Sequence, residues 1–320
     1  MISSSRANYL DAPVARGLPT CNKHQTPSKR VNIVIWGHKI MKTFVLGVGA
    51  QKAGTTWLHN YLSTRTDADF GIVKEYHIFD AITLPSSRAF HRKAREQARK
   101  MLGQGYKSWR DSSVLTRLAF MSNPQLYYAF FADLLNDKNI QMTGDITPSY
   151  NGLSAATLTE IKENFNRRGI RVVPVFLMRD PVNRLQSSVQ MAFREKGIQP
   201  TLDQELAAMD QAHMKKIDSN RVNYAHTVGV LDEVFGDDIF YNFYENLFQD
   251  DTITSLCNFL NIPHAPGNFD LRVNVSKTKN VIDAADTARF AAGYQQVYDF
   301  CAKRFGANVP QKWHSPTVSL

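Results

Sequence analysis

The sequence has few cysteines, few acidic residues and no long apolar run, and each of these shortages excludes some classes of protein. It has only three cysteines in 320 residues (Cys21, Cys257 and Cys301), an odd number without the spacing of metal ligands. This scarcity indicates either a reducing compartment or simply buried thiols. No run approaches the roughly 20 apolar residues of a membrane-spanning helix, and the best N-terminal candidate, residues 31–36, is too short for a span or a signal core. We therefore predict a cytoplasmic protein with no membrane association.

Acidic residues are also scarce, because 29 of them stand against 38 lysines and arginines, and the net charge is +9. Residues 1–40 hold six basic residues and one acidic residue, so they carry +5 and the remaining residues carry +4. A nucleic-acid-binding surface would interleave basic and aromatic residues, and no such stretch occurs. We therefore predict no nucleic-acid partner. The charge of +4 on the residues after position 40 suffices for binding a small anionic ligand.

The first forty residues differ in composition from the rest of the chain. Residues 1–30 are rich in Ser, Pro, Asn and Arg and show little periodicity, which predicts disorder. Met41 stands directly before the first core strand, and a hydrophobic content of 43% suits a substantial core. We expect residues 1–40 to form a disordered N-terminal extension and residues 41–320 to form a single domain.

The most informative segment is residues 47–58, which read Gly-Val-Gly-Ala-Gln-Lys-Ala-Gly-Thr-Thr-Trp-Leu. It follows an apolar run and opens a helical pattern. The glycines let backbone N–H groups approach oxyanions, and the start of a helix adds partial positive charge. Lys52 adds a full charge, and Thr55 and Thr56 add hydroxyl donors. The segment therefore predicts an anion-binding loop.

The loop differs from one that binds Mg-ATP. A Walker A loop requires Gly-x4-Gly-Lys-Ser/Thr. Gly49 and Gly54 keep the glycine spacing, but Thr55 stands at the lysine position and the lysine has moved to Lys52. This pattern predicts a phosphate loop built for something other than Mg-ATP.

A second strand-to-helix junction begins with the apolar run 172–178. Pro174 suggests that the strand starts there or is irregular. Asp180 is suited to cap the next helix, and Pro181 fits the first turn of that helix. Arg179 stands at the end of the strand, where it can reach a ligand.

Four residues of this second helix are predicted to share one face, since they fall at i, i+3, i+4 and i+7: Arg184, Ser187, Ser188 and Met191. Arg179 and Ser187 can then hold one phosphate between them. The alternative is a helix with an ordinary surface arginine.

Residues 74–80, Lys-Glu-Tyr-His-Ile-Phe-Asp, carry a possible proton acceptor. In extended backbone Glu75, His77 and Phe79 face the same way. A carboxylate beside an imidazole near an anion site is a natural candidate to take a proton from an attacking hydroxyl or amine. Both Glu75 and His77 are therefore candidate catalytic residues, and the alternative is a solvated loop.

The order of elements predicts an α/β fold with a mainly parallel sheet covered by helices on both faces. Ligands of such sheets lie beyond the carboxyl ends of the strands, so the Lys52 loop and Arg179 are expected at the same edge. We expect strands at 43–48, 172–178 and 239–243, and helices at 54–64, 88–102, 123–136, 154–167, 221–235, 252–260 and 283–305.

Several of these segments resemble motifs of the sulfotransferases that use 3′-phosphoadenosine 5′-phosphosulfate (PAPS). Residues 51–58, Gln-Lys-Ala-Gly-Thr-Thr-Trp-Leu, are similar to the 5′-phosphosulfate loop, and Arg-x-Pro-x-x-Arg-x-x-Ser at 179–187 is similar to the 3′-phosphate motif. The Glu75 segment resembles the Glu-x-His-Phe-Phe run of the heparan-sulfate branch. Residues 144–150 resemble the Glu-Lys-Thr-Pro-x-Tyr segment of that branch, with Ile146 in place of the lysine. The resemblance covers residues 42–280.

The resemblance implies a P-loop-NTPase-like three-layer sandwich that moves a sulfuryl group from PAPS to a hydroxyl or amine and releases PAP, without a metal. It implies that Glu75 is the base, with His77 as its neighbour or substitute. Lys52 would neutralise charge on the leaving phosphate oxygen, and Trp57 would stack on adenine. The implied cofactor-binding residues are Gln51, Lys52, Ala53, Gly54, Thr55, Thr56, Trp57, Arg179, Ser187, Lys277 and Lys279, the last two from a late basic loop.

Two rival functions remain open at this point. A P-loop kinase or ATPase would bind Mg-ATP and need an acidic residue after an apolar strand; Asp180 follows one, but beside Pro181 it looks like a helix cap. A non-catalytic PAP- or polyanion-binding protein is supported by the basic N-terminal residues and by helix 88–102. The acceptor, a glycan or a small hydroxylated metabolite, and the oligomeric state cannot be read from the sequence.

Overall fold

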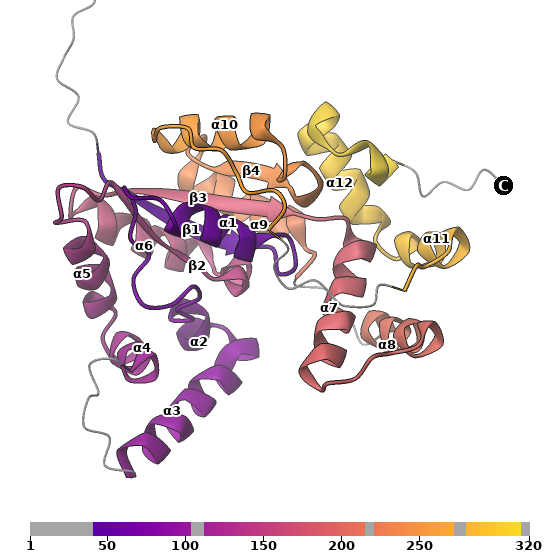
Figure 1. Ribbon diagram of the computed structural model, residues 1–320, viewed down its shortest axis with the longest axis horizontal. Helices are drawn as coiled ribbons and strands as arrows, with labels where there is room; N and C mark the ends of the chain where they lie inside the picture. The colour runs from indigo at the N-terminus through magenta and orange to yellow at the C-terminus, as the bar shows by residue number, and fades with distance from the viewer. Residues whose placement is uncertain (1–40, 104–111, 215–220, 272–279, 315–320) are drawn as a thin grey trace, which may run out of the picture. The chain divides into compact units, whose positions relative to one another are not determined.

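The computed structural model describes residues 41–103, 112–214, 221–271 and 280–314. The expectation of disorder for residues 1–40 lies outside these ranges. At the centre is a four-stranded sheet in the order β2-β1-β3-β4, in which all three pairings are parallel (Figure 1). Its strands are β1 (Thr43–Gly49), β2 (Met142–Ile146), β3 (Arg171–Met178) and β4 (Phe240–Phe243). The predicted parallel α/β architecture is thus confirmed.

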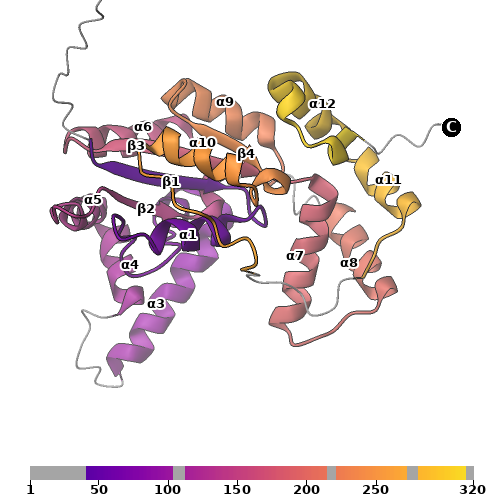
Figure 2. The same ribbon diagram turned by 45° about the horizontal axis from the view of Figure 1, so that its top comes forward.

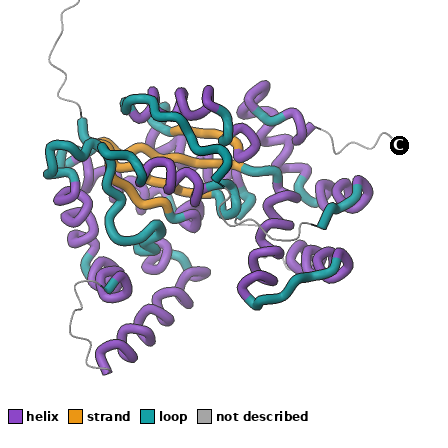
Figure 3. Tube along the Cα trace, in the orientation of Figure 1, coloured by secondary structure: helices purple, strands orange, loops and turns teal. Residues whose placement is uncertain are grey.

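Helices cover both faces of the sheet, so β1 is buried along its whole length, as its unbroken apolar character requires. On one face Phe44 packs against Phe131 of α5 (Pro124–Leu134) and stacks on Phe165 of α6 (Ala155–Asn166). On the other, Tyr61 of α1 (Thr55–Ser63) lies 3.2 Å from the sulfur of Cys257 in α10 (Asp250–Leu260). Figure 3 shows the strands in orange between these helices.

The remaining helices flank this core in two groups. The first group is α2 (Phe79–Thr83), α3 (Arg88–Gly103) and α4 (Ser113–Ser122), and α3 packs on α4 through Ala94, Ala98 and Val114. The second is α7 (Pro181–Glu195), α8 (Leu202–Met214), α9 (Tyr224–Phe235), α11 (Ala284–Ala292) and α12 (Gln295–Phe305). In Figure 2, α3 and α7 lie on opposite sides of the region below the sheet, whereas α9 and α12 lie above the sheet.

Several expected boundaries were wrong. Strand β3 starts at Arg171 and runs through Pro174, whose missing N–H is tolerated because pairing with β4 begins only at Val175. The helix predicted at 283–305 is two helices, separated at Gly293 and Tyr294. Strand β2 and helices α2, α4 and α8 were not predicted.

Two expectations from composition concern thiols and membranes. Cys257 and Cys301 are buried free thiols, and Cys21 lies outside the described residues. Within the described ranges, no helix combines the length and the apolar character needed to cross a bilayer.

Replacing Gly54 with alanine should destabilise the fold by about 2–4 kcal/mol, because two penalties combine. Gly54 has φ of +87°, and an added Cβ would lie 2.6 Å from Cδ2 of Leu247 and 3.1 Å from Cδ2 of Tyr244. The free energy of unfolding from urea titrations measures the loss.

The matched control is Gly169→Ala. Gly169 has φ of +71°, but an added Cβ would have no neighbour within 4 Å, so only the backbone strain of about 1–2 kcal/mol applies. Equal losses in the two variants would show that the close approach of Leu247 to the loop is unimportant.

Candidate functional site

A cleft of about 1400 Å³ lies at the carboxyl ends of the strands. It is lined by the loop after β1, by Arg179 after β3 and by four residues after β2: Pro148, Ser149, Asn151 and Gly152. This is the edge where open parallel sheets bind ligands. The Lys52 loop, Arg179 and the Glu75 segment, which are far apart in the sequence, all line this one cleft.

The loop after β1 presents unpaired donors at the start of α1. The N–H groups of Thr55, Thr56 and Trp57 have no acceptor within the described part of the chain, as is typical of a first helical turn. Gly54 precedes the helix in a left-handed conformation. Three amides at a helix N-terminus form a site that suits an anion.

Lys52 precedes these amides in the same loop, lines the same cleft and has φ of +70°. Burial, with the nearby positive charges of Arg194 and Arg179, lowers the pKa of its ammonium group to about 8. The low pKa reflects an excess of positive charge in a partly desolvated place. An anion bound there would restore the usual pKa and gain from the interaction.

Arg179 joins the second motif to this loop. Its Nη1 donates a 2.8 Å hydrogen bond to the carbonyl oxygen of Lys52, 127 residues earlier. Its guanidinium group lies 4.2 Å from the centre of the Tyr244 ring, and its Nε is buried with no acceptor among the described residues. Burial lowers the pKa of Arg179. A buried, incompletely satisfied guanidinium is suited to a phosphate.

The helix after β3 begins as its sequence predicts. Asp180 accepts a 2.8 Å hydrogen bond from the N–H of Asn183, and Pro181 occupies the first turn. Ser187 lines the cleft. Arg184, expected on the same face, is instead fully buried and does not line the cleft, because the face turned to the cleft runs through Asn183 and Ser187, from which Arg184 is rotated around the helix.

The other predicted ligands occupy different places. Gln51 lines the cleft, whereas Ala53 is fully buried and donates its N–H to Ala50. The ring of Trp57 is 4% exposed and stacks on Tyr61 and Phe269, although it belongs to the cleft lining. Stacking of Trp57 on adenine therefore stays a prediction. Lys277 and Lys279 lie outside the described residues.

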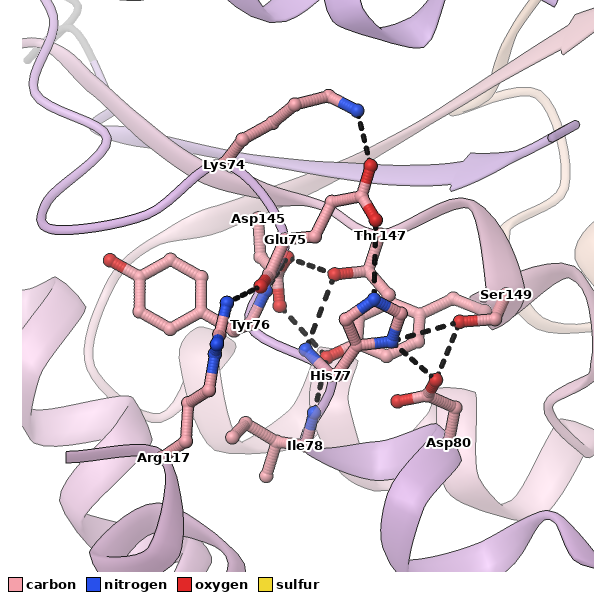
Figure 4. Close-up of polar contacts among 11 residues, drawn as sticks. Lys74, Glu75, Tyr76, His77, Ile78, Asp80, Arg117, Asp145, Thr147 and Ser149 are labelled. Carbon is pink, nitrogen blue, oxygen red and sulfur yellow. Dashed lines mark hydrogen bonds and ion pairs between the residues drawn. The ribbon is translucent and has the colours of Figure 1, made fainter. Parts of the chain in front are cut away.

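Glu75 and His77 form a chain of charged contacts (Figure 4). His77 Nε2 lies 3.2 Å from Oε2 of Glu75, and Nδ1 lies 2.7 Å from Oδ2 of Asp80. Ser149 donates a 2.5 Å hydrogen bond to the same Asp80 oxygen, and Lys74 forms an ion pair with Glu75. The imidazole is thus held between two carboxylates.

These contacts shift both pKa values. Burial favours neutral Glu75, but the hydrogen bond with His77 and the charge of Lys74 outweigh it and lower the pKa to about 2. Burial also favours neutral His77, but the hydrogen bonds to Asp80 and Glu75 raise its pKa to about 9. At neutral pH Glu75 is ionised and His77 carries a proton.

The sequence suggested an extended backbone for this segment, but the structure shows that the segment is not extended. His77 has φ of +57°, and Phe79 is the first residue of α2 and is buried in the core. The left-handed residue turns the chain, so Glu75 and His77 meet through a local reversal and not through strand alternation.

Sequence reasoning missed the partners of these two residues. Asp80 follows His77 by one helical turn, and this i, i+3 spacing was a usable signal once a helix starting at Phe79 is assumed. Arg117 of α4 donates a 2.7 Å hydrogen bond to the carbonyl oxygen of Glu75. Its separation of 42 residues leaves no local signal. Across the described ranges, no group of three or more His, Cys, Asp or Glu side chains is arranged to hold a metal ion.

Comparisons with known proteins identify the family and similar folds. The family model described as "Sulfotransferase family" matches residues 45–266. The crystal structure of a sulfotransferase from Alicyclobacillus acidocaldarius is 18% identical, with a TM-score of 0.50 over 85% of this chain and 99% of that one. A sulfotransferase domain from the curacin biosynthetic pathway is 14% identical, with a TM-score of 0.47 over 82% of this chain and 97% of that one. None of the curated proteins matches the chain.

Proposed function

The chain belongs to the sulfotransferase family, whose model matches well over half of it, and from this premise we propose that it moves a sulfuryl group from PAPS to an acceptor hydroxyl or amine and releases PAP. The family is the one that residues 51–58 and 179–187 indicated. Membership of the heparan-sulfate-type branch stays a prediction.

One observation carries the choice of PAPS as donor, namely the hydrogen bond from Arg179 to the carbonyl oxygen of Lys52. It joins an anion-binding helix start to a buried guanidinium group within one cleft. A nucleotide with phosphate on both the 3′ and 5′ positions matches two such centres. Thr55 and Thr56 would hold the 5′-phosphate, and Arg179 and Ser187 the 3′-phosphate.

In the proposed step the acceptor oxygen attacks sulfur in line with the bond to the leaving phosphate. A new O–S bond forms, the S–O bond to the phosphate of PAP breaks, and the proton of the acceptor passes to Glu75. Lys52 stabilises the charge that develops on the leaving oxygen. Catalysis then comes mainly from positioning and charge stabilisation, as in phosphoryl transfer.

The pKa values support Glu75, and not His77, as the base. His77, with a pKa of about 9, already carries a proton at neutral pH and cannot accept another. Glu75, with a pKa of about 2, is ionised but weakly basic. The negative charges of bound PAPS would raise its proton affinity during the reaction. His77 then orients the carboxylate.

Arg179→Ala should weaken the binding of PAP by roughly 10- to 100-fold, because a charge-assisted hydrogen bond is worth about 1.5–3 kcal/mol. Isothermal titration calorimetry measures the change. Arg289→Ala is the control, since Arg289 is an exposed arginine that pairs with Asp210 and Asp286 outside the cleft. An unchanged PAP affinity in Arg179→Ala would remove this residue from the site.

The acceptor region of the cleft supports a hydroxylated substrate, and we propose a carbohydrate. Small hydroxyl and amide side chains line it: Ser86, Ser87, Ser149, Asn151 and Asn223. Such groups suit the many donors and acceptors of a sugar. Beyond Ser87, α3 exposes four arginines at i, i+4, i+7 and i+11: Arg88, Arg92, Arg95 and Arg99. Acceptor screens should therefore contrast carboxylated with neutral sugars.

Transfer of radiolabelled sulfate from PAPS tests the proposal. The protein is incubated with labelled PAPS and with neutral sugars, carboxylated sugars, phenols and small amines. Label on a sugar supports the proposal. Binding of PAP without transfer to any acceptor favours a non-catalytic PAP-binding protein, and hydrolysis of Mg-ATP favours a P-loop ATPase.

Other features stay predictions from the sequence. These are the single domain over residues 41–320, the cytoplasmic location, the lack of nucleic-acid and membrane partners, and a reaction that needs no metal. The role of Lys277 and Lys279 over the nucleotide is also a prediction.

A further inference from the structure

We propose that Asp145, at the end of β2, is the positioning residue that fixes the turn on which Glu75 and His77 lie. The inference rests on the proposed function, because it assigns a role to a residue behind the proposed base. Asp145 does not line the cleft. It would therefore act on the reaction only through the residues that it holds.

The amides of three consecutive residues of the turn connect to this one carboxylate (Figure 4). The N–H of Tyr76 donates directly to Oδ1 of Asp145 at 3.3 Å. The N–H of His77 donates to the Thr147 hydroxyl at 3.5 Å, and that hydroxyl donates to Oδ1 of Asp145 at 2.6 Å. This second connection thus passes through one hydroxyl group, which lies between the amide and the carboxylate.

The third amide uses a tyrosine in the same way. The N–H of Ile78 donates to the hydroxyl of Tyr150 at 3.2 Å, and that hydroxyl donates to Oδ2 of Asp145 at 2.8 Å. The two oxygens of Asp145 therefore organise the whole turn. Lys74 lies just before this turn. Its carbonyl oxygen accepts a hydrogen bond from the N–H of Ile146, the last residue of β2, at 3.4 Å.

Asp145 and the hydroxyl groups that connect it to the turn are closed to solvent. Asp145 and Thr147 are fully buried, and Tyr150 is 1% exposed. Burial raises the pKa of Asp145 to about 6 although its hydrogen-bond donors lower it, so the carboxylate is ionised at pH 8. A buried carboxylate is solvated only by its hydrogen-bond donors, so it fixes the positions of the groups that donate to it.

The turn needs such support because His77 has φ of +57°, a conformation that a residue with a side chain adopts only at a cost. That conformation brings the imidazole between Glu75 and Asp80. If the amides of the turn lost their partners, the backbone at His77 would relax. The Glu75 carboxylate would then leave the position from which it takes the proton.

The test compares two tyrosines that bind the same oxygen. Tyr150 and Tyr127 both donate to Oδ2 of Asp145, at 2.8 and 3.0 Å, and both are buried. Only the Tyr150 hydroxyl also accepts from an amide of the turn. We expect Tyr150→Phe to lower kcat roughly 10- to 100-fold with little change in the KM for PAPS, and Tyr127→Phe to retain kcat within about threefold. Equal effects on kcat would overturn the inference.

A spectroscopic readout keeps the test independent of activity. The His77 imidazole titrates in NMR spectra, where His77→Asn identifies its signal. Its pKa should move from about 9 toward the ordinary value near 6.5 in Tyr150→Phe and stay unchanged in Tyr127→Phe. An unchanged His77 titration in Tyr150→Phe contradicts the positioning role even if the protein transfers no sulfate.

Asp145→Asn provides a second variant of the same shape, in which an NH2 group replaces one oxygen of the carboxylate. We expect the same shift of the His77 titration and the same loss of kcat, while PAP affinity stays within about threefold, since Lys52 and Arg179 do not touch Asp145. If the wild-type protein binds no PAP, the proposed function fails but the titration still decides the role of Asp145. If the wild type transfers sulfate and Asp145→Asn keeps full kcat with folded-state spectra, only the role of Asp145 fails.

Discussion

Lys52→Ala should lower kcat about a hundredfold, as the loss of one preorganised charge at a transition state commonly does. Lys52 is partly buried in the cleft near the charges of Arg194 and Arg179, and its own charge is proposed to stabilise the developing phosphate anion. Initial rates at saturating PAPS measure the effect. Lys162→Ala is the control, because Lys162 is also half-buried but binds the carbonyl oxygen of Val234 outside the cleft.

The pH dependence of the same residue gives an independent check. The pKa of Lys52 is lowered to about 8, so its charge is present below pH 8 and is lost above it. For the free enzyme, kcat/KM should therefore fall above about pH 8, while kcat, which reports the PAPS complex, should hold to higher pH. Lys52→Arg should remove the alkaline limb, since arginine stays protonated. Near-normal turnover in Lys52→Ala would show that the lysine has another role.

Glu75→Gln should lower kcat by about 100- to 1000-fold, within the range expected for a lost general base. Glutamine keeps the size of the side chain and a hydrogen bond to His77, but it cannot accept the acceptor's proton. PAP affinity should change little, since the residues proposed to hold the phosphates are Lys52, the first turn of α1 and Arg179. Stopped assays with labelled PAPS give kcat, and calorimetry gives the affinity.

The dependence of kcat/KM on pH below about pH 8 distinguishes Glu75 from His77 as the base. With Glu75 as base, its pKa of about 2 leaves it ionised throughout. Between the pKa of about 6 of Asp145 and the pKa of about 8 of Lys52, kcat/KM should therefore stay nearly level. With His77 as base, activity would require the deprotonated ring and would rise tenfold per pH unit up to about pH 9. A fully active Glu75→Gln variant with that rising profile would transfer the role to His77.

Local sequence signals were enough to predict that the Lys52 loop and Arg179 line the same cleft. The glycine spacing around Lys52 and the Asp180–Pro181 helix start each depend on a few neighbouring residues, and both form as their residue types require. Parallel strand order then brings Arg179 to the Lys52 loop, because both follow adjacent strands at the same edge.

The Glu75 and His77 side of the cleft depends on contacts that no local sequence pattern predicts. Strand β2 reads Met-Thr-Gly-Asp-Ile, which is too short and too polar to be recognised, yet its Asp145 holds a turn 69 residues earlier in the chain. The left-handed backbone of His77 has no sequence signature, since it follows from tertiary hydrogen bonds. Arg184 was assigned to the wrong side because an i, i+3 pair still differs by about 60° around a helix.

Calorimetry with three nucleotides tests the central claim most directly, that one cleft holds both phosphate groups of a 3′,5′-bisphosphorylated adenosine. PAP, AMP and Mg-ATP are titrated into the full chain under the same conditions. We expect PAP to bind roughly 10- to 100-fold more tightly than AMP, a difference that Arg179→Ala should abolish. Equal affinities for PAP and AMP, or tighter binding of Mg-ATP than of PAP, would contradict the account.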